Sequence, residues 1–206
     1  LAPDLIIPLL GVYRTSLDKQ RLWLRDKGLP DRVERALADD TWRGIGEIHI
    51  FALDRHNPVF VRIVRLAAAR KVPLLIHSDP AVIDALFEHA PNATVIWAHA
   101  GAYPVPALLR DYLQRYPNLH IDRSVREERL APEGELSEDW EWLLIEHSER
   151  FLVGVDTSRT NRWSEYSEAA GKIRNFLNQL PPDVAKNIAF SNADRLFQAV
   201  AVRSQT

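Results

Sequence analysis

Short apolar runs alternate with segments of helical pattern along the chain. The runs are rich in leucine, isoleucine and valine, and they are apolar almost throughout, which is typical of parallel strands covered on both faces. Six of them occur, at residues 5–13, 44–51, 72–78, 93–101, 119–124 and 150–157. A strand followed by a helix, repeated in this way, predicts an α/β fold in which helices cover a parallel sheet.

The helical segments begin at recognisable capping residues. Asn57, Asp79 and Ser137 each stand immediately before a residue suited to a first helical turn. A short polar side chain at that position can accept a hydrogen bond from a free backbone N–H of the first turn. We therefore predict that these three side chains act as N-caps.

The strand ends favour a barrel over a doubly wound sheet. No run is followed by a glycine-rich phosphate loop, which a nucleotide-binding doubly wound sheet would carry. Polar residues instead follow run after run, as in a (β/α)8 TIM barrel, which collects its active site from many strand ends. A barrel usually needs about 250 residues and eight strands. We predict one barrel domain over residues 1–206, with two strands missing before the first run.

Histidines and carboxylates stand at the predicted strand ends. The residues are Glu47, His49, His77, His99 and Asp156. Imidazole and carboxylate groups are the usual ligands of a catalytic divalent metal. A single histidine at a strand end is more often structural, but residues at matching ends of several parallel strands are expected to converge. His49 follows Glu47 by two residues, so both should point the same way on a strand, and His49 is a candidate for substrate contact.

The motifs around these residues resemble a known family. They read "GIGEIHIF", "PLLIHSD", "VIWAHAG", "FLVGVDT" and, near the end, "NIAFSNADRLF". This series resembles the metal-dependent amidohydrolase superfamily, in particular its amidohydrolase-2 branch. Counting back from Asp156 as the end of strand eight, the visible runs are strands 3 to 8. Strands 1 and 2, with the His-x-His motif of the family, would then lie upstream of Leu1.

The resemblance implies roles for four residues. His77 and His99 correspond to metal ligands on strands five and six. Asp156 corresponds to the aspartate that touches the metal and takes a proton from water as general base. Glu47 stands where relatives carry a carboxylated lysine, a glutamate or neither, and it would be a further ligand. The implied cofactor is one or two divalent ions, zinc first, with manganese or iron as alternatives.

The function expected from this resemblance is metal-dependent hydrolysis of a small carbonyl compound such as a lactone, amide or ester. Three alternatives are kept. The first is a metal-dependent decarboxylase of the same branch, which would use the same ligands. The second is a TatD-like phosphodiesterase, favoured by Glu47. The third is a barrel that binds a ligand without catalysis.

Arginines at the strand ends are candidates for binding the substrate. Guanidinium binds a carboxylate through two parallel hydrogen bonds. Arg14 and Arg123 follow the first and fifth runs, and Arg126 comes shortly afterwards. We therefore predict contact between substrate and Arg14, Arg123 or both, with Arg126 as a further candidate.

The charges of the chain are nearly balanced. Lysine and arginine number 26 against 28 aspartate and glutamate, for a net charge of −2. This balance argues against a nucleic-acid partner, and the apolar runs are far shorter than a bilayer crossing. We expect a small-molecule substrate and no membrane contact, and a homo-oligomer is left open. For cellular location, the cytoplasm is slightly favoured over the periplasm or secretion.

Overall fold

Five parallel strands form a single sheet in the computed structural model, which describes residues 6–15, 18–39, 41–101, 104–124, 127–157 and 160–203. They are β1 (Ile45–Ile50), β2 (Leu74–Ser78), β3 (Val95–Trp97), β4 (Leu119–Asp122) and β5 (Phe151–Leu152). Each strand pairs in parallel with the next one in the sequence. The order lacks the reversal of a doubly wound sheet and is the order of a TIM-barrel wall.

The first predicted strand is reduced to a single parallel bridge. Leu10 pairs with Ile45, and its N–H donates to the carbonyl of Gly44 at 2.9 Å. Residues 1–5 lie outside the described part of the chain. The segment takes the predicted place beside β1, but Pro8 has no N–H to donate to a longer ladder.

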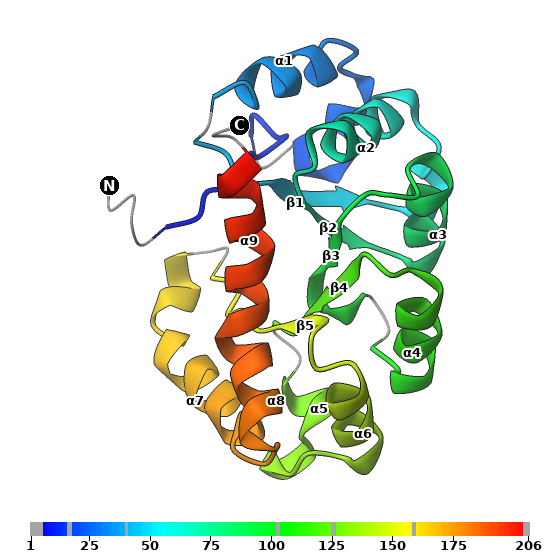
Figure 1. Cartoon of the computed structure of the whole chain (residues 1–206). Coiled ribbons are helices and arrows are strands. Elements are labelled where there is room, and N and C mark those ends of the chain that lie inside the picture. The colour runs from blue at the N-terminus through cyan, green and yellow to red at the C-terminus, as the bar shows by residue number, and fades with distance from the viewer. Residues whose placement is uncertain are drawn as a thin grey trace.

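Helices connect and cover the strands. They are α1 (Leu29–Ala36), α2 (Pro58–Arg70), α3 (Pro80–His89), α4 (Pro106–Arg115), α5 (Glu127–Leu130), α6 (Glu138–Glu146), α7 (Tyr166–Leu177), α8 (Pro182–Lys186) and α9 (Asn192–Arg203). Short turns of helix are η1 (Asp18–Gln20), η2 (Leu22–Arg25), η3 (Ala52–Asp54), η4 (Ala98–Ala100), η5 (Pro132–Gly134), η6 (Thr160–Trp163) and η7 (Asn187–Ser191). Figure 1 shows α2, α3 and α4 in a row along one side of the sheet, with α7 and α9 on the other. The α/β prediction is confirmed.

The strands alternate between a face packed on helices and an inner face. In β2, Leu74 and Ile76 are fully buried, whereas Leu75 and His77, the residues that follow each of them, are partly exposed. The same two-residue period places Ile48 and Ile50 of β1 in the core. Polar side chains at alternate positions therefore come to the inner face, where they can meet across neighbouring strands.

Only one of the three predicted N-caps is formed by its side chain. Asn57 Oδ1 accepts a hydrogen bond from the N–H of Val59 at 2.9 Å, which confirms that cap. The predictions for Asp79 and Ser137 are wrong. The carboxylate of Asp79 instead accepts a hydrogen bond from the N–H of Ala52 at 3.1 Å. The carboxylate of Asp79, which the sequence predicts to cap α3, is therefore bonded to the loop after β1 instead.

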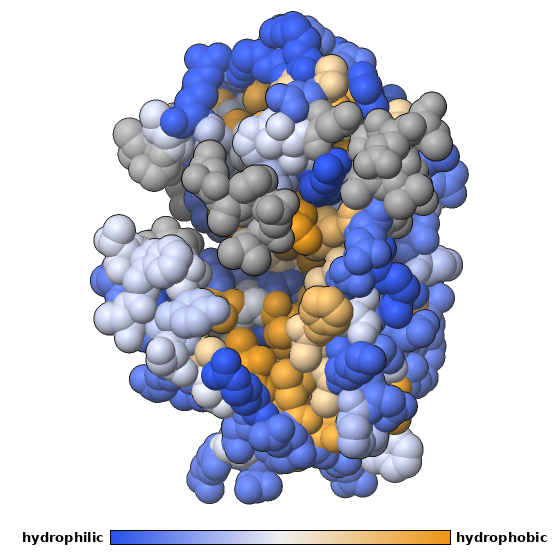
Figure 2. Space-filling view, turned by 60° about the vertical axis from the view of Figure 1, so that its left-hand side comes forward, coloured by the Kyte–Doolittle hydropathy of each residue, from blue (hydrophilic) through white to orange (hydrophobic). Residues whose placement is uncertain are grey.

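Apolar surface reaches the outside on one face of the molecule. Figure 2 shows hydrophobic side chains gathered in a hollow near the middle of this view, bordered by hydrophilic residues. Among the described residues, no helix combines the length and the apolar character needed to span a membrane.

Candidate metal centre

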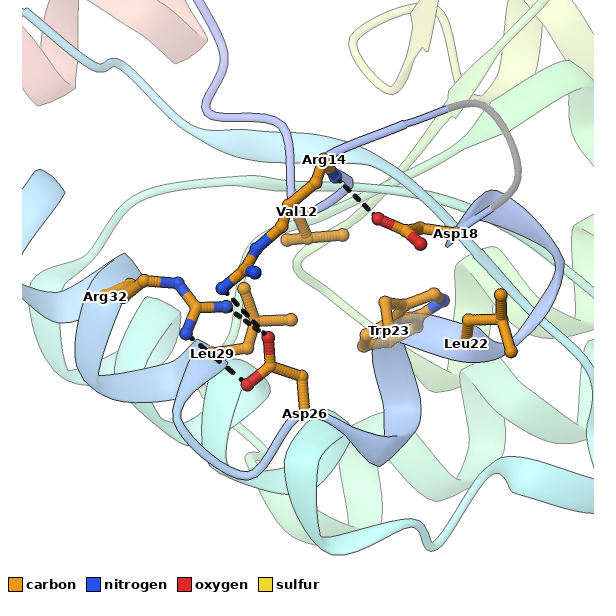
Figure 3. A pocket seen from close by; sticks show the side chains of 8 residues that line it. All are labelled: Val12, Arg14, Asp18, Leu22, Trp23, Asp26, Leu29 and Arg32. Atoms are coloured by element: carbon orange, nitrogen blue, oxygen red, sulfur yellow. Dashed lines mark hydrogen bonds and ion pairs between the residues drawn. The ribbon is translucent and has the colours of Figure 1, made fainter.

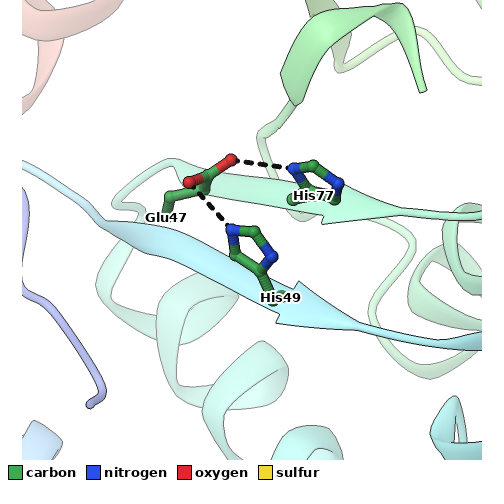
Figure 4. A group of neighbouring side chains, drawn as sticks. All are labelled: Glu47, His49 and His77. Carbon is green, nitrogen blue, oxygen red and sulfur yellow. Dashed lines mark hydrogen bonds and ion pairs between the residues drawn. The ribbon is translucent and has the colours of Figure 1, made fainter. Parts of the chain in front are cut away.

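A carboxylate from β1 lies at the centre of a group of imidazoles. Glu47 Oε2 is 3.0 Å from His49 Nε2, and Glu47 Oε1 is 3.1 Å from both His77 Nδ1 and His99 Nε2. Figure 4 shows Glu47 and His49 on β1 turned toward His77 on β2. The rings of His49 and His77 stack with their centroids 4.1 Å apart. Side chains from three consecutive strand ends therefore meet at one edge of the sheet.

The backbone of β1 is shaped to bring Glu47 inward. The register with β2 shifts between Ile45 and Ile48, so β1 carries a bulge there. Gly46 has a φ of 153°, and a β-carbon on it would lie 2.6 Å from Leu75 Cβ. Only glycine accommodates both this conformation and this close approach of the strands. The bulge redirects the following side chain, that of Glu47.

His99 reaches the group from a strained turn after β3. It lies in η4 with a φ of 58°, and Ala100 beside it has a φ of 54°. A non-glycine residue in the left-handed region is uncommon and recurs at functional sites. The side chain of His99 is only 7% exposed, so the turn delivers a buried imidazole to the carboxylate of Glu47.

Burial and mutual contact shift the ionisation of these groups. Burial by itself would raise the pKa of Glu47. Hydrogen bonds from His49 and His77, and from His99 when its ring carries both protons, outweigh burial and hold that pKa well below its usual range. Burial lowers the pKa of His49. For His99, burial opposes protonation, but the carboxylates of Glu47, Asp122 and Asp156 raise its pKa above the usual value. The carboxylate of Glu47 is therefore ionised, and its negative charge favours a cation beside it.

The donor set fits a divalent metal ion. Glu47, His49 and His77 each offer one ligand atom, and these atoms lie within 4.8 Å of one another. Imidazole nitrogen together with carboxylate oxygen suits zinc, iron and manganese. His99 brings a second imidazole to the same carboxylate oxygen as His77. Three of the four residues to which the resemblance assigns the metal, Glu47, His77 and His99, thus meet at one carboxylate oxygen, with His49 as an additional donor.

Asp156, the expected general base, lies beyond the end of β5 and is held by an arginine. Its Oδ2 accepts a hydrogen bond from Arg162 Nη1 at 2.9 Å. Its φ of 49° is again left-handed. Its charge acts on His99, but neither Asp156 nor His99 is one of the three described residues whose ligand atoms all lie within 4.8 Å of one another. Unlike His99, Asp156 makes no contact with Glu47 among the described hydrogen bonds. The structure places Asp156 near the group but not within it.

Arg14 lines a different cavity. Figure 3 shows this cavity, of about 120 Å³, with Arg14 and Arg32 directed at Asp26. Arg14 Nη2 lies 3.4 Å from Asp26 Oδ2, and its side chain is 68% exposed. Tyr13 points the other way, since its hydroxyl accepts a hydrogen bond from the backbone N–H of His49. Consecutive residues of an extended segment face opposite sides, so Arg14 is not brought to the group around Glu47.

Arg123 faces the helices rather than the site. It is 1% exposed, and its guanidinium carbon lies 4.4 Å from the ring centre of Trp140 on α6. It follows Leu119 and Ile121 at two-residue intervals, and both are fully buried. The alternation of the strand therefore directs Arg123 into the helix layer. Arg126, the third candidate, lies outside the described residues.

Four polar residues at the site had no assigned role in the sequence prediction. They are Tyr13, Lys19, Asp122 and Ser124. Lys19 Nζ lies 3.5 Å from Glu47 Oε2, and it comes from a turn of helix whose sequence carries no signal for this contact. Asp122 and Ser124 could have been found from the sequence. They flank Arg123, so the alternation of the strand directs them to the inner face when Arg123 faces the helices. Ser124 Oγ lies 2.6 Å from His99 Nδ1.

Comparison with known families shows which family the chain belongs to. A sequence model described as amidohydrolase, of the amidohydrolase-2 type, matches residues 22–199. The chain belongs to the amidohydrolase family. The match spans all five strands of the sheet, and it confirms the resemblance carried by the strand-end motifs. Family membership indicates a hydrolase. No curated protein matches this amidohydrolase.

Two solved structures share the fold of this amidohydrolase. One is an uncharacterised TIM-barrel protein from Bordetella bronchiseptica, with a TM-score of 0.62 and 16% identity, covering 98% of this chain and 69% of that one. The other is an amidohydrolase from Burkholderia multivorans with bound HEPES, with a TM-score of 0.54 and 16% identity, covering 85% of this chain and 71% of that one. These likenesses concern the fold, and they agree with the predicted TIM barrel.

Proposed function

We propose that this amidohydrolase is a metal-dependent hydrolase of a small carbonyl compound such as a lactone, amide or ester. The observation that carries the proposal is the contact of one ionised carboxylate, that of Glu47, with imidazoles from three strand ends at 3.0–3.1 Å. Glu47, His77 and His99 would hold the ion, with His49 as a further donor. The nearly balanced charge supports a small-molecule substrate rather than nucleic acid.

A bound divalent ion would lower the pKa of water toward neutrality and polarise a substrate carbonyl. The chain's own residues supply the remaining functions. Asp156 Oδ1 accepts the proton of the attacking water and later returns it to the leaving group. Arg162 holds Oδ2 of the same carboxylate at 2.9 Å and so orients it. The buried ring of His99 and the partly buried ring of His49 limit the access of bulk water to this edge of the sheet.

One contact also favours decarboxylation as a second candidate. The ammonium of Lys19 lies 3.5 Å from Glu47 Oε2, and this positive charge beside the proposed ion would also attract a substrate carboxylate. Both a carboxylate-bearing lactone and the substrate of a decarboxylase would satisfy that charge. Release of carbon dioxide from a carboxylate substrate would favour the decarboxylase, and consumption of one water per product would favour the hydrolase.

Elemental analysis of the purified protein tests the metal. After expression with added zinc, manganese and iron, we expect at least one ion per chain. The matched control is the double variant Glu47→Gln, His77→Ala, which should lose most of that metal while keeping its circular-dichroism spectrum. Less than one ion per wild-type chain would overturn the proposal.

Asp156→Asn tests the general base. We expect it to keep the fold and most of the metal but to lower turnover by at least about 100-fold, since the amide cannot accept the proton. Turnover of dihydrocoumarin and of p-nitrophenyl acetate gives the measurement, with Asp183→Asn on α8 as the control that should retain wild-type rates. Unchanged activity of Asp156→Asn would remove this residue from the mechanism.

A further inference from the structure

A chain of three polar groups runs from β4 to the far side of the His99 ring. Ser124 Oγ donates a hydrogen bond to Asp122 Oδ2 at 2.6 Å, and the same hydroxyl lies 2.6 Å from His99 Nδ1. Asp122 Oδ2 also accepts the backbone N–H of His99 at 3.2 Å. Ser124 and His99 are both buried, so water does not compete freely for these contacts.

The neighbouring strand segment is shaped to admit this chain of groups. A β-carbon at Gly154, just after β5, would lie 2.9 Å from Asp122 Oδ1 and 3.4 Å from Ser124 Cβ. The first of these distances is too short for a carbon against an oxygen. The absence of a side chain at Gly154 therefore leaves the space that the carboxylate of Asp122 occupies.

Counting protons along the chain determines the state of His99. A serine hydroxyl has one proton, and a carboxylate oxygen can only accept. The proton of Ser124 goes to Asp122 Oδ2, so Ser124 Oγ must accept from His99, and Nδ1 of His99 carries a proton. This order applies while the carboxylate of Asp122 is ionised, since both of its oxygens can then only accept.

The consequence appears on the opposite edge of the ring. In a neutral imidazole with its proton on Nδ1, Nε2 presents a lone pair. That lone pair faces Glu47 Oε1 at 3.1 Å, and the carboxylate also presents lone pairs. Two acceptors at this distance repel each other unless a cation lies between them. A metal ion or a second proton on the ring would meet this need.

We propose that Asp122 and Ser124 are positioning residues that hold neutral His99 in the Nδ1–H tautomer, so that its Nε2 lone pair is directed at the metal. The proposal rests on the proposed metal centre for its function, but the tautomer itself is a property of the protein alone. Residues that orient a metal-binding histidine in this way commonly raise metal affinity by about 10- to 100-fold.

Nitrogen NMR of the metal-free protein tests the tautomer directly. With histidine labelled by ¹⁵N, two-bond correlations between ring protons and nitrogens show which nitrogen carries the proton. The His99 signals are identified by their loss in His99→Gln, and spectra are followed upward in pH until the ring is neutral. We expect the proton on Nδ1 in the wild type. A wild-type proton on Nε2 would overturn the proposal, and this measurement requires no folded Ser124 variant.

Three serine variants separate positioning from simple packing. Ser124→Ala removes the hydroxyl, and we expect the His99 proton to move to Nε2 and Zn²⁺ affinity to fall about 10- to 100-fold in competition with a chelator. Ser124→Thr keeps a hydroxyl and should restore both the Nδ1 proton and most of the affinity. Ser78→Ala removes another buried serine hydroxyl, on β2, and should change neither. Ser124→Ala with an unchanged tautomer would overturn the proposal.

The two readouts keep this proposal distinct from the proposed function. If the wild type binds no Zn²⁺, the metal-dependent hydrolase is overturned, and the NMR result alone decides the tautomer. If Zn²⁺ binds tightly but His99 carries its proton on Nε2, the metal centre stands and the positioning role of Asp122 and Ser124 fails.

Discussion

At the scale of single residues, Gly46 shows how backbone geometry controls the direction of a side chain at the candidate metal centre. Its φ is 153°, and a β-carbon on it would lie only 2.6 Å from Leu75 Cβ, so the site has no room for a side chain. The bulge that it permits directs Glu47 toward His77 and His99. A residue without a side chain thus decides where the central carboxylate of the candidate site lies.

Gly46→Ala should therefore lower the stability of the folded protein. The added β-carbon would lie 2.6 Å from Leu75 Cβ and 2.7 Å from the Leu75 carbonyl oxygen, so the strands must separate. We expect a loss of at least about 2 kcal/mol in the free energy of unfolding, measured by urea denaturation. Gly171→Ala in α7 is the control, because nothing lies within 4 Å of the new carbon. It should stabilise the protein by about 0.5–1 kcal/mol. Equal stability of Gly46→Ala and wild type would contradict this account.

At the scale of secondary-structure elements, α9 is attached to the sheet through its first residue. Asn192 is buried, and its Nδ2 donates to the carbonyls of Ser148 and Phe151, both at 2.7 Å. Its Oδ1 accepts from Arg195 at 2.6 Å. The "NADRLF" motif, part of the family resemblance, therefore has a structural role at this point, since the amide joins the last helix to β5.

Replacing this amide should loosen the attachment of α9. Asn192→Ala removes both donors and should cost about 2 kcal/mol in the free energy of unfolding, because two buried carbonyls lose their partner. Asn192→Asp should cost more, since a carboxylate would face those carbonyls as an acceptor. Urea denaturation gives the measurement. Asn178→Ala at the exposed end of α7 is the control, with an expected change within about 0.5 kcal/mol. A smaller loss for Asn192→Asp than for Asn192→Ala would refute this assignment.

At the scale of the whole molecule, the proposed ion would tie together three strand ends. Glu47, His77 and His99 come from β1, β2 and the turn after β3, and non-local contacts of this kind exist only in the folded state. An ion that binds only the folded state at 100 times its Kd stabilises that state by about 2.7 kcal/mol. The metal would therefore act on global stability as well as on chemistry.

Removal of the metal should lower the melting temperature. For a chain of this length, a stabilisation of that size corresponds to roughly 5–10 °C. We expect a difference of this order between protein with Zn²⁺ and protein treated with EDTA, measured by circular dichroism. Glu47→Gln should show little difference between the two conditions. Equal melting temperatures for wild type with Zn²⁺ and with EDTA would argue against a bound ion.

The alternation of side chains between the two faces of a strand explains which site residues the sequence could identify. Glu47 and His49 alternate with the buried Ile48 and Ile50 of β1, and His77 alternates with the buried residues of β2. The structure brings these three side chains together. The charge of Arg123 suggests contact with a substrate, but this residue lies on the same side of the strand as Leu119 and Ile121 and so packs on Trp140. The same rule applied to that strand would have selected Asp122 and Ser124.

Other features depend on partners that are distant in sequence. The carboxylate of Asp79 bonds to the N–H of Ala52, 27 residues away, in place of its own helix. Lys19 reaches Glu47 from η1. No local pattern contains these pairings, because each depends on how two segments are placed by the intervening chain.

The sequence by itself determined the parallel strands, the covering helices, the family and the set of histidines and carboxylates at one edge of the sheet. The family follows from the resemblance of the strand-end motifs. The other features follow from local periodicity, since each strand sends alternate residues to the same face and all parallel strands end on the same side. Only the tertiary structure decided that Glu47 lies among three imidazoles and that Ser124 stands behind His99. Those contacts depend on a bulge, a left-handed turn and distances of a few ångströms, which are set when the strands pack together.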